Sequence, residues 1–207
     1  MNYIGSKLSL IPFIWAAVED CVGIDLSDRV FCDLFAGTGV VGRSFKSRVR
    51  KVISNDWEYY SYVLNRNYIG NHIALDSQDE LIRELNELSG LEDGFIFRNY
   101  CSGSGSGRQY FADENGKKID AIRIQIERWK ENGYISEDMY FFLLASLLES
   151  ADKLANTASV YGAFLKHLKA AAQKSLILEP AYFTTHSNKH EVYCEDANML
   201  IKDIQGD

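Results

Sequence analysis

The sequence has 207 residues, which suffices for one domain of ordinary size or for one domain with a sizeable insertion. Hydrophobic residues make up 46% and charged residues 25%, so a core can be buried and global disorder is disfavoured. The formal net charge of −7 does not by itself favour a nucleic-acid partner, and no stretch approaches the roughly 20 apolar residues that cross a bilayer.

Neither the cysteines nor the N-terminus carries a signal for export or for metal binding. Cys21, Cys32, Cys101 and Cys194 are scattered and lack the paired spacings of a zinc site. The first seven residues lack the basic region and apolar run of a signal peptide. We therefore expect reduced thiols, no metal, no membrane partner and a cytoplasmic protein.

Positive charge is concentrated in two stretches. Residues 42–51 carry five basic side chains and no acid, and residues 153–189 carry five lysines against one acid, Glu179. Because phosphate contacts are local, such stretches can bind DNA on an acidic protein. The alternative is an ordinary solvated helix face, and charge alone does not decide between the two.

In chain order, the first part alternates helices and strands. Ser9 is a candidate cap for a helix whose first turn tolerates Pro12 and whose apolar residues continue to Val22. Two short apolar runs predict buried strands. The expected elements are a helix over 9–22, a strand over 29–35, a helix beginning at 42–47, a strand over 52–55 and a helix over 58–69. This order predicts the opening of a doubly wound α/β sheet.

The middle of the chain is expected to be helical. An amphipathic helix runs through Leu81 to Leu88 and ends at Gly90, and the Gly/Ser-rich residues 101–108 predict a flexible loop. Helical patterns follow at 119–129 and 139–147, and the next strand pattern is 191–195. The sequence therefore predicts three segments: the first sheet part (1–90), a helical insertion (91–185) and a return to the sheet (186–207).

The strongest local motif is Asp33-Leu34-Phe35-Ala36-Gly37-Thr38-Gly39-Val40-Val41-Gly42. Its glycines let the backbone turn at a strand end and approach a ligand closely. Asp56, at the end of the next strand, is placed to accept hydrogen bonds from ribose hydroxyls. The same spacing satisfies the dinucleotide fingerprint, so an NAD site has to be considered.

Two charged residues favour S-adenosylmethionine over NAD. A carboxylate at Asp33 suits the cationic amino group of a methionine moiety and would repel a pyrophosphate. Lys7, in Tyr3-Ile4-Gly5-Ser6-Lys7, can reach the methionine carboxylate. A capping or turn role for Asp33 is the alternative.

Taken as an ordered set, these residues resemble the Dam-like, alpha-group DNA adenine-N6 methyltransferases of bacterial restriction-modification systems. In that family an aromatic-glycine-lysine segment precedes a Phe-x-Gly-x-Gly loop, a ribose-binding acid and an inserted target-recognition domain. Tyr3 to Lys7, Phe35 to Gly39 and Asp56 match in order and spacing. Residues 157–166 and 191–196 also look like family segments, so the resemblance covers essentially the entire chain.

The resemblance implies a Rossmann-like α/β methyltransferase fold, S-adenosylmethionine as cofactor and double-stranded DNA as partner. Asp196 would lie near the adenine amine and Trp57 would pack on the adenine face; a helix cap and core packing are their respective alternatives. The implied cofactor-binding residues are Tyr3, Lys7, Asp33, Phe35, Ala36, Gly37, Thr38, Gly39, Asp56, Trp57 and Asp196.

The family's catalytic Asp-Pro-Pro-Tyr is absent, because the only two prolines, Pro12 and Pro180, are not adjacent. The segment 179–182, Glu-Pro-Ala-Tyr, has a longer acid, lacks the second proline and precedes the strand at 191–195, so we interpret it as a turn. We therefore assign no catalytic residue. We expect an inactive fragment with an incomplete sheet, which a second chain or an oligomer would complete.

For DNA contact, the sequence points to the loop residue Arg108 and to a basic helical patch of Lys166, His167 and Lys169. Two other functions stay open at this stage. One is a non-catalytic DNA-binding or regulatory module derived from such a methylase. The other is an NAD-dependent oxidoreductase, for which no catalytic His, Lys or Tyr constellation is evident.

Overall fold

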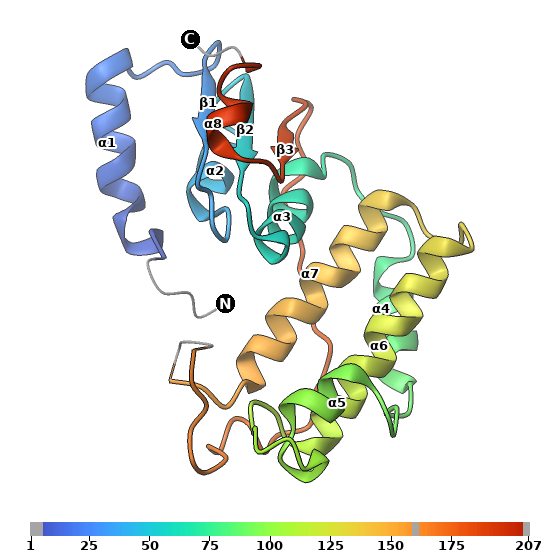
Figure 1. The fold of residues 1–207 in the computed structure, drawn as a ribbon. Helices are drawn as coiled ribbons and strands as arrows, with labels where there is room; N and C mark the ends of the chain where they lie inside the picture. Colours follow the sequence, from blue (N-terminus) through green and yellow to red (C-terminus); the bar gives the residue numbers. More distant parts are fainter. Residues whose placement is uncertain (1–5, 159–161, 205–207) are drawn as a thin grey trace. The chain divides into compact units, whose positions relative to one another are not determined.

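A computed structural model describes residues 6–158 and 162–204 of the chain (Figure 1). Within these residues the chain divides into two compact units. The sheet unit joins residues 6–74 to residues 182–204, and the helical unit holds residues 75–181. Within both described ranges, no helix combines the length and apolarity that crossing a bilayer requires.

The sheet unit contains a parallel three-stranded sheet in the order β1-β2-β3. The register pairs Phe31 with Val52 and Ser54 with Val192. The expected α/β class and all three expected strands are confirmed. The elements are a 3-10 turn (Leu8–Leu10), α1 (Ile11–Val22), β1 (Val30–Asp33), α2 (Val40–Phe45), β2 (Lys51–Asn55), α3 (Tyr59–Asn65), a π-helical turn (Arg66–Gly70), β3 (Glu191–Tyr193) and α8 (Ala197–Leu200).

Two details of these elements differ from expectation. Ser9 does not cap α1: it lies inside the 3-10 turn, where Leu10 N donates to Lys7 O, and Leu10 takes the cap position. The helix expected over 58–69 is α-helical only to Asn65, after which the backbone widens into the π-helical turn.

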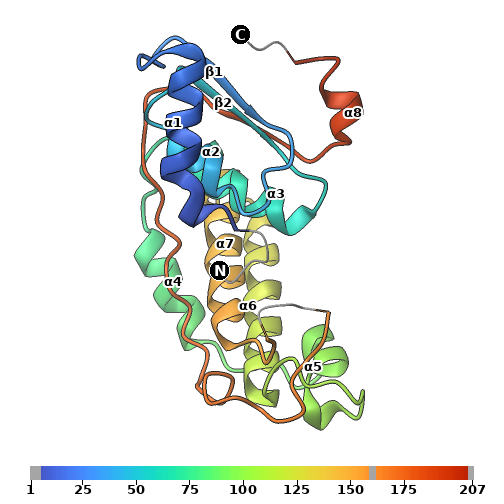
Figure 2. The same ribbon diagram turned by 90° about the vertical axis from the view of Figure 1, so that its left-hand side faces the viewer.

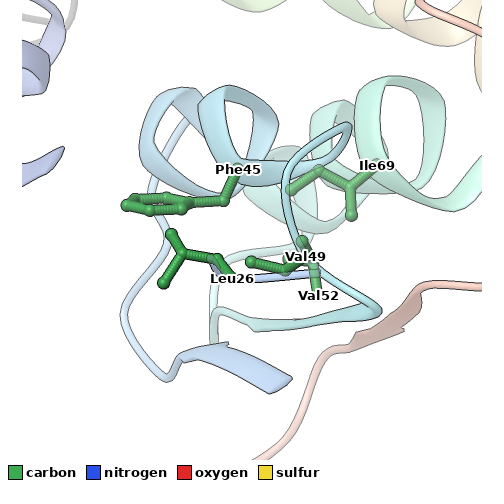
Figure 3. Packing of buried hydrophobic residues seen from close by; sticks show 5 residues of the cluster. All are labelled: Leu26, Phe45, Val49, Val52 and Ile69. Carbon is green, nitrogen blue, oxygen red and sulfur yellow. The ribbon is translucent and has the colours of Figure 1, made fainter. Parts of the chain in front are cut away.

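The core of the sheet unit lies between the strands and the helices on one side of them (Figures 2 and 3). Because side chains alternate along a strand, Phe31, Val52 and Val192 reach the same face. The rings of Phe31 and Phe45 stack with centroids 4.2 Å apart. Fully burying one such side chain contributes about 1.5–3 kcal/mol. The buried cluster is Leu26, Phe45, Val49, Val52 and Ile69.

The basic stretch 42–51 is engaged inside the sheet unit. Lys46 is 2% exposed, and its ammonium donates to Tyr68 O at 2.9 Å and to Asn71 O at 2.5 Å. Burial, aided by the charge of Arg43, lowers the pKa of Lys46 to about 8. Arg48 and Lys51 form ion pairs with Glu19 and Glu191, respectively. Neither a DNA-binding face nor a solvated helix face describes these three side chains.

A buried histidine holds the start of β3 against β2. His190 is 6% exposed, and its Nδ1 accepts a hydrogen bond from Val52 N at 2.9 Å. The rings of His72 and His186 lie 5.6 and 6.2 Å from it, centroid to centroid. Burial lowers the pKa of His190 to about 4, and the charges of Lys46, His72 and His186 add to this shift. The folded protein therefore requires the neutral imidazole.

The loop between β1 and α2 depends on glycine at two positions. Gly37 and Gly39 have φ values of 54° and 74°, in the left-handed region that side chains disfavour. Gly39 also begins α2 as its cap residue. A Cβ atom on Gly39 would lie 2.4 Å from Asn65 Oδ1, so α3 leaves no room for a side chain there.

The helical unit consists of α4 (Gln78–Glu87), α5 (Phe95–Tyr100), a 3-10 turn (Ser102–Ser104), α6 (Asp113–Glu131) and α7 (Glu137–Leu154). The patterns that predicted α6 and α7 are confirmed by burial, for example of Ile122, Ile126 and Phe142. The unit begins at residue 75, whereas we expected 91. The reason is that Asn86 of α4 bonds both backbone groups of Leu178 and so ties α4 into the unit.

Long-range contacts shape the segment 95–108, of which residues 101–108 were expected to form a flexible loop. The carboxylate of Asp120 in α6 accepts from Ile96 N and Phe97 N at 2.9 Å each and thereby caps α5. Cys101 is fully buried, and Asp113 Oδ1 accepts from Gly103 N at 2.8 Å. The loop is therefore anchored at its first half, whereas a flexible loop was expected throughout.

The segment 179–182 is hydrogen-bonded to side chains of α7. Glu179 N donates to Ser150 Oγ and Ala181 N donates to Ser146 Oγ, at 3.0 and 2.9 Å. The Glu179 carboxylate pairs with Lys153. These contacts give the tetrapeptide a structural role at the end of the helical unit.

The buried imidazole predicts a specific pH dependence of stability. The unfolded chain binds a proton at His190 near pH 6.5, and the folded chain does so only near pH 4. The contribution of this residue is therefore complete above pH 6.5 and is lost as the pH falls from 6.5 to 4. In His190→Asn, Oδ1 replaces the acceptor Nδ1 without titrating. Urea unfolding across this range should show a shallower pH slope for the variant than for the wild type; equal slopes would refute the assignment.

The crowding at Gly39 predicts that Gly39→Ala lowers the free energy of unfolding by about 2 kcal/mol or more. Left-handed backbone costs a side chain roughly 1–2 kcal/mol, and the contact with Asn65 adds to that cost. Gly105→Ala is the matched control, because Gly105 has nearly the same left-handed backbone (φ 78°, ψ 1°) and no atom within 4 Å of its Cβ position. Chemical denaturation should give the smaller loss for the control; equal losses would exclude crowding by Asn65.

Candidate functional site

The candidate site lies where the three parallel strands end. Asp33 is the last residue of β1, Asp56 follows β2 directly, and Cys194 follows β3. In open α/β sheets, ligands bind outside the carboxyl ends of the strands. The structure therefore brings Asp33, the glycine loop and Asp56 together, as the sequence predicted.

Asp33 is a half-buried carboxylate beside a second one. Its Oδ1 accepts a hydrogen bond from Phe35 N at 3.3 Å, which is the turn role considered above. Burial raises the pKa of the Asp33 carboxyl and the Asp56 charge adds to the rise, while the Phe35 N–H and the Lys7 charge oppose it. A cationic ligand would stabilise the charged Asp33 carboxylate and so offset the effects of burial and of the Asp56 charge.

Asp56 connects the glycine loop to the start of α3. Its Oδ2 accepts from Gly37 N at 2.7 Å, and its Oδ1 accepts from Glu58 N at 3.0 Å. A carboxylate offers about four acceptor positions, so each oxygen keeps one for a ligand hydroxyl. The arrangement fixes the carboxylate plane before any ligand arrives.

Two buried asparagines support the site, and we did not single them out from the sequence. Asn55, 1% exposed, donates to Leu34 O and Glu195 O and accepts from Glu195 N, at 3.0–3.2 Å. It thereby joins the ends of all three strands. Asn65, also 1% exposed, donates to Gly37 O at 3.0 Å. The sequence signal that could have identified them is an amide at the end of a largely apolar run.

The aromatic side chains of the site are exposed. Phe35 is 80% and Trp57 is 69% exposed, so the core-packing alternative for Trp57 is wrong. Cys194 Sγ lies 3.6 Å from Trp57 O, which places the end of β3 next to this residue. Large apolar faces beside two carboxylates suit a ligand with both a cationic and an aromatic part.

The other residues predicted to bind the cofactor differ in their contacts and burial. Asp196 caps α8, with Oδ1 accepting from Asn198 N at 2.7 Å, so the cap alternative is confirmed and the adenine contact stays a prediction. Ala36 is buried and its N–H donates to Asn55 O at 2.9 Å. Thr38 is half-buried in the loop. Tyr3 lies outside the described residues.

The residues predicted to contact DNA do not form a helical patch. Lys166, His167 and Lys169 lie in an irregular segment, because Asn156 bonds the backbone of Leu165 and of Lys169 and holds the chain against the end of α7. Lys169 Nζ also donates to Thr157 O at 3.0 Å, whereas Lys166 and His167 are exposed. Arg108 is exposed, with its guanidinium 5.6 Å from the centre of the Tyr100 ring.

The carboxylate acceptors of the site suit the cationic amino group of S-adenosylmethionine better than the pyrophosphate of a dinucleotide. Two carboxylates flank a loop whose glycine positions present backbone alone, and burial together with the Asp56 charge raises the pKa of Asp33, so additional negative charge would be unfavourable there. A pyrophosphate would add negative charge to that position, whereas an amino group would reduce it. Across the described ranges, no group of three or more His, Cys, Asp or Glu is arranged to hold a metal ion.

Comparison with known proteins identifies the family. The family model of the D12 class N6 adenine-specific DNA methyltransferases matches residues 3–207. Type II methyltransferase M.NlaIII of Neisseria lactamica is 63% identical over 207 residues, covering 100% of this chain and 62% of the relative. Type II methyltransferase M.CviAII of Paramecium bursaria Chlorella virus 1 is 38% identical over 97% of the chain and 60% of the relative.

A third relative, type II methyltransferase M.FokI of Planomicrobium okeanokoites, is 36% identical over the whole chain, which spans 33% of it. The chain thus spans between a third and about three fifths of these proteins. No solved structure matches it significantly. The oxidoreductase alternative is wrong, since the matched family is one of methyltransferases. The chain belongs to the D12 class of N6 adenine-specific DNA methyltransferases.

Proposed function

We propose that the sheet unit forms the S-adenosylmethionine-binding part of a site-specific DNA adenine-N6 methyltransferase of a restriction-modification system. The observation that carries the proposal is the pair of carboxylates at the ends of β1 and β2, one on each side of a glycine loop. The type II methyltransferases that the chain resembles support the reaction class. Because the chain spans only part of them, the activity is proposed for the whole protein.

Each residue has a proposed role that follows from its chemistry. Asp33 would accept from the methionine amino group, Asp56 from the ribose hydroxyls, and Lys7 would pair with the methionine carboxylate. Trp57 would pack on the adenine face. The cofactor supplies a methyl group activated by its sulfonium. Phe35, Ala36, Gly37, Thr38 and Gly39 would line the pocket, with Asp196 near the adenine amine.

Transfer to adenine needs groups that this sequence does not supply. In the proposed reaction, a flipped-out adenine offers its N6 to polar acceptors that the family's Asp-Pro-Pro-Tyr provides, and that tetrapeptide is absent here. The contacts of residues 179–182 with α7 leave them a structural task. We therefore propose that this chain alone is inactive and that a further polypeptide segment, a second chain or an oligomer completes the sheet.

The helical unit is the proposed target-recognition part, with double-stranded DNA as its partner. Arg108, Lys166 and His167 present exposed polar side chains in loops of this unit. Loops carried by a rigid helical frame can follow a phosphate backbone without a preformed groove. Lys169 is the weaker candidate, because its ammonium already bonds Thr157 O.

If Asp33 and Asp56 bind the cofactor, then Asp33→Asn and Asp56→Asn should each weaken S-adenosylmethionine binding about tenfold or more. Losing one charge-assisted hydrogen bond costs roughly 1.5–3 kcal/mol, which corresponds to that factor. Isothermal calorimetry measures the change, and NAD should give no binding heat. Asp28→Asn is the matched control, because Asp28 is exposed in the same unit and carries the same charge. Unchanged affinity in both site variants would refute the assignment.

If Lys166 contacts a phosphate, Lys166→Ala should weaken binding to any duplex and reduce the slope of log affinity against log salt by about 0.9. Fluorescence anisotropy with labelled duplex DNA over a salt series gives the slope. Lys202→Ala, an exposed lysine of the sheet unit, is the control and should leave the slope unchanged. A wild-type slope in Lys166→Ala would exclude this phosphate contact.

A further inference from the structure

Asn65 is a buried amide directly beneath the glycine loop. It is the last residue of α3 and is 1% exposed. Its Nδ2 donates to Gly37 O at 3.0 Å and to Ser61 O at 2.7 Å, and its Oδ1 accepts from Ser54 Oγ at 2.7 Å. One side chain therefore joins β2, α3 and the loop, and all three contacts are buried.

These contacts leave the amide a single orientation. Ser54, which is fully buried, donates to the oxygen, so the nitrogen must face the two carbonyls. Both amide hydrogens are then used. A side chain whose donors and acceptor are all engaged in a low-dielectric interior is a rigid support.

Gly37 connects Asn65 to Asp56. Gly37 donates its N–H to Asp56 Oδ2 at 2.7 Å, and its carbonyl accepts from Asn65. Gly37 is thus held from both sides, by the candidate ribose acid and by the buried amide. Since Gly37 has the left-handed φ of 54°, it has many other conformations available without these bonds.

Asn65 also limits the neighbouring position. The Cβ position of Gly39 lies 2.4 Å from its Oδ1 and 3.0 Å from its Cγ. The loop therefore rests directly on this side chain at two residues, Gly37 and Gly39.

We propose that Asn65 is a positioning residue of the cofactor site: without touching the ligand, it holds Gly37 and, through it, the Asp56 carboxylate in the binding geometry. The inference rests on the proposed function for the identity of the ligand, S-adenosylmethionine. The support of the loop itself does not depend on that identity. The two can therefore be tested separately.

The test compares Asn65→Leu with the wild-type chain. Leucine keeps the branched outline of asparagine with larger terminal groups, and it removes both donors and the acceptor. S-adenosylmethionine affinity, measured by calorimetry, should fall about tenfold, as expected for one or two lost hydrogen bonds. Amide hydrogen exchange at Gly37 and Gly39 should accelerate by a similar factor, with the exchange at the buried strand residue Val52 unchanged.

A control and a second variant accompany this comparison. Ser61→Ala is the matched control, because this buried hydroxyl of the same helix has no hydrogen-bond partner among the described residues while its carbonyl keeps the bond to Asn65. It should leave loop exchange and affinity unchanged. Ser54→Ala removes the hydroxyl that orients the Asn65 amide, and it should give a smaller loss of S-adenosylmethionine affinity than Asn65→Leu. It also keeps the inference testable if Asn65→Leu does not fold.

The outcomes separate the two proposals. Faster exchange at Gly37 and Gly39 in a chain whose wild type does not bind S-adenosylmethionine supports the positioning role and refutes the cofactor assignment. Faster exchange throughout the unit, with unchanged affinity of the folded protein, indicates a merely structural residue and overturns the inference. Wild-type exchange at both Gly37 and Gly39 in folded Asn65→Leu, or in Ser54→Ala, also overturns it.

Discussion

The hydrogen bond from Gly37 N to the Asp56 carboxylate is the interaction on which the candidate site depends. It joins the loop after β1 to the residue after β2, beside the bonds of Asn55 with Leu34 O and Ala36 N. Asn55 adds the end of β3 to the same network. A ligand that uses these groups therefore meets a preorganised set and does not have to order it, which reduces the cost of binding.

Buried polar groups brace the sheet unit away from this edge as well. His190 accepts from Val52 N near the start of β3, and Lys46 donates to carbonyls that end the π-helical turn. Burial disfavours the charged form of both side chains and therefore lowers the pKa of each. The hydrogen bonds offset this cost by satisfying backbone groups: an N–H of β2 in the case of His190 and two carbonyls at the end of the π-helical turn in the case of Lys46.

The sequence predicted those features that depend on local pattern. The three strands, α6, α7 and the pairing of Asp33 with Asp56 around the glycine loop follow from apolar periodicity and from strand-end chemistry. Side chains whose partners are distant in the chain were not predictable in this way. Asp120 caps α5 from 24 residues away, and Asn65 reaches Gly37 across 28 residues. The basic composition of residues 42–51 was also misleading, because their two lysines and three arginines make contacts within the sheet unit.

The measurement that tests the central claim most directly is a crystal structure of the chain with S-adenosylmethionine. The account predicts the methionine amino group at the Asp33 carboxylate and the ribose hydroxyls at Asp56, with the Gly37 backbone unmoved. Cofactor density at another edge of the sheet, or Asp33 and Asp56 turned away from a bound cofactor, would contradict it.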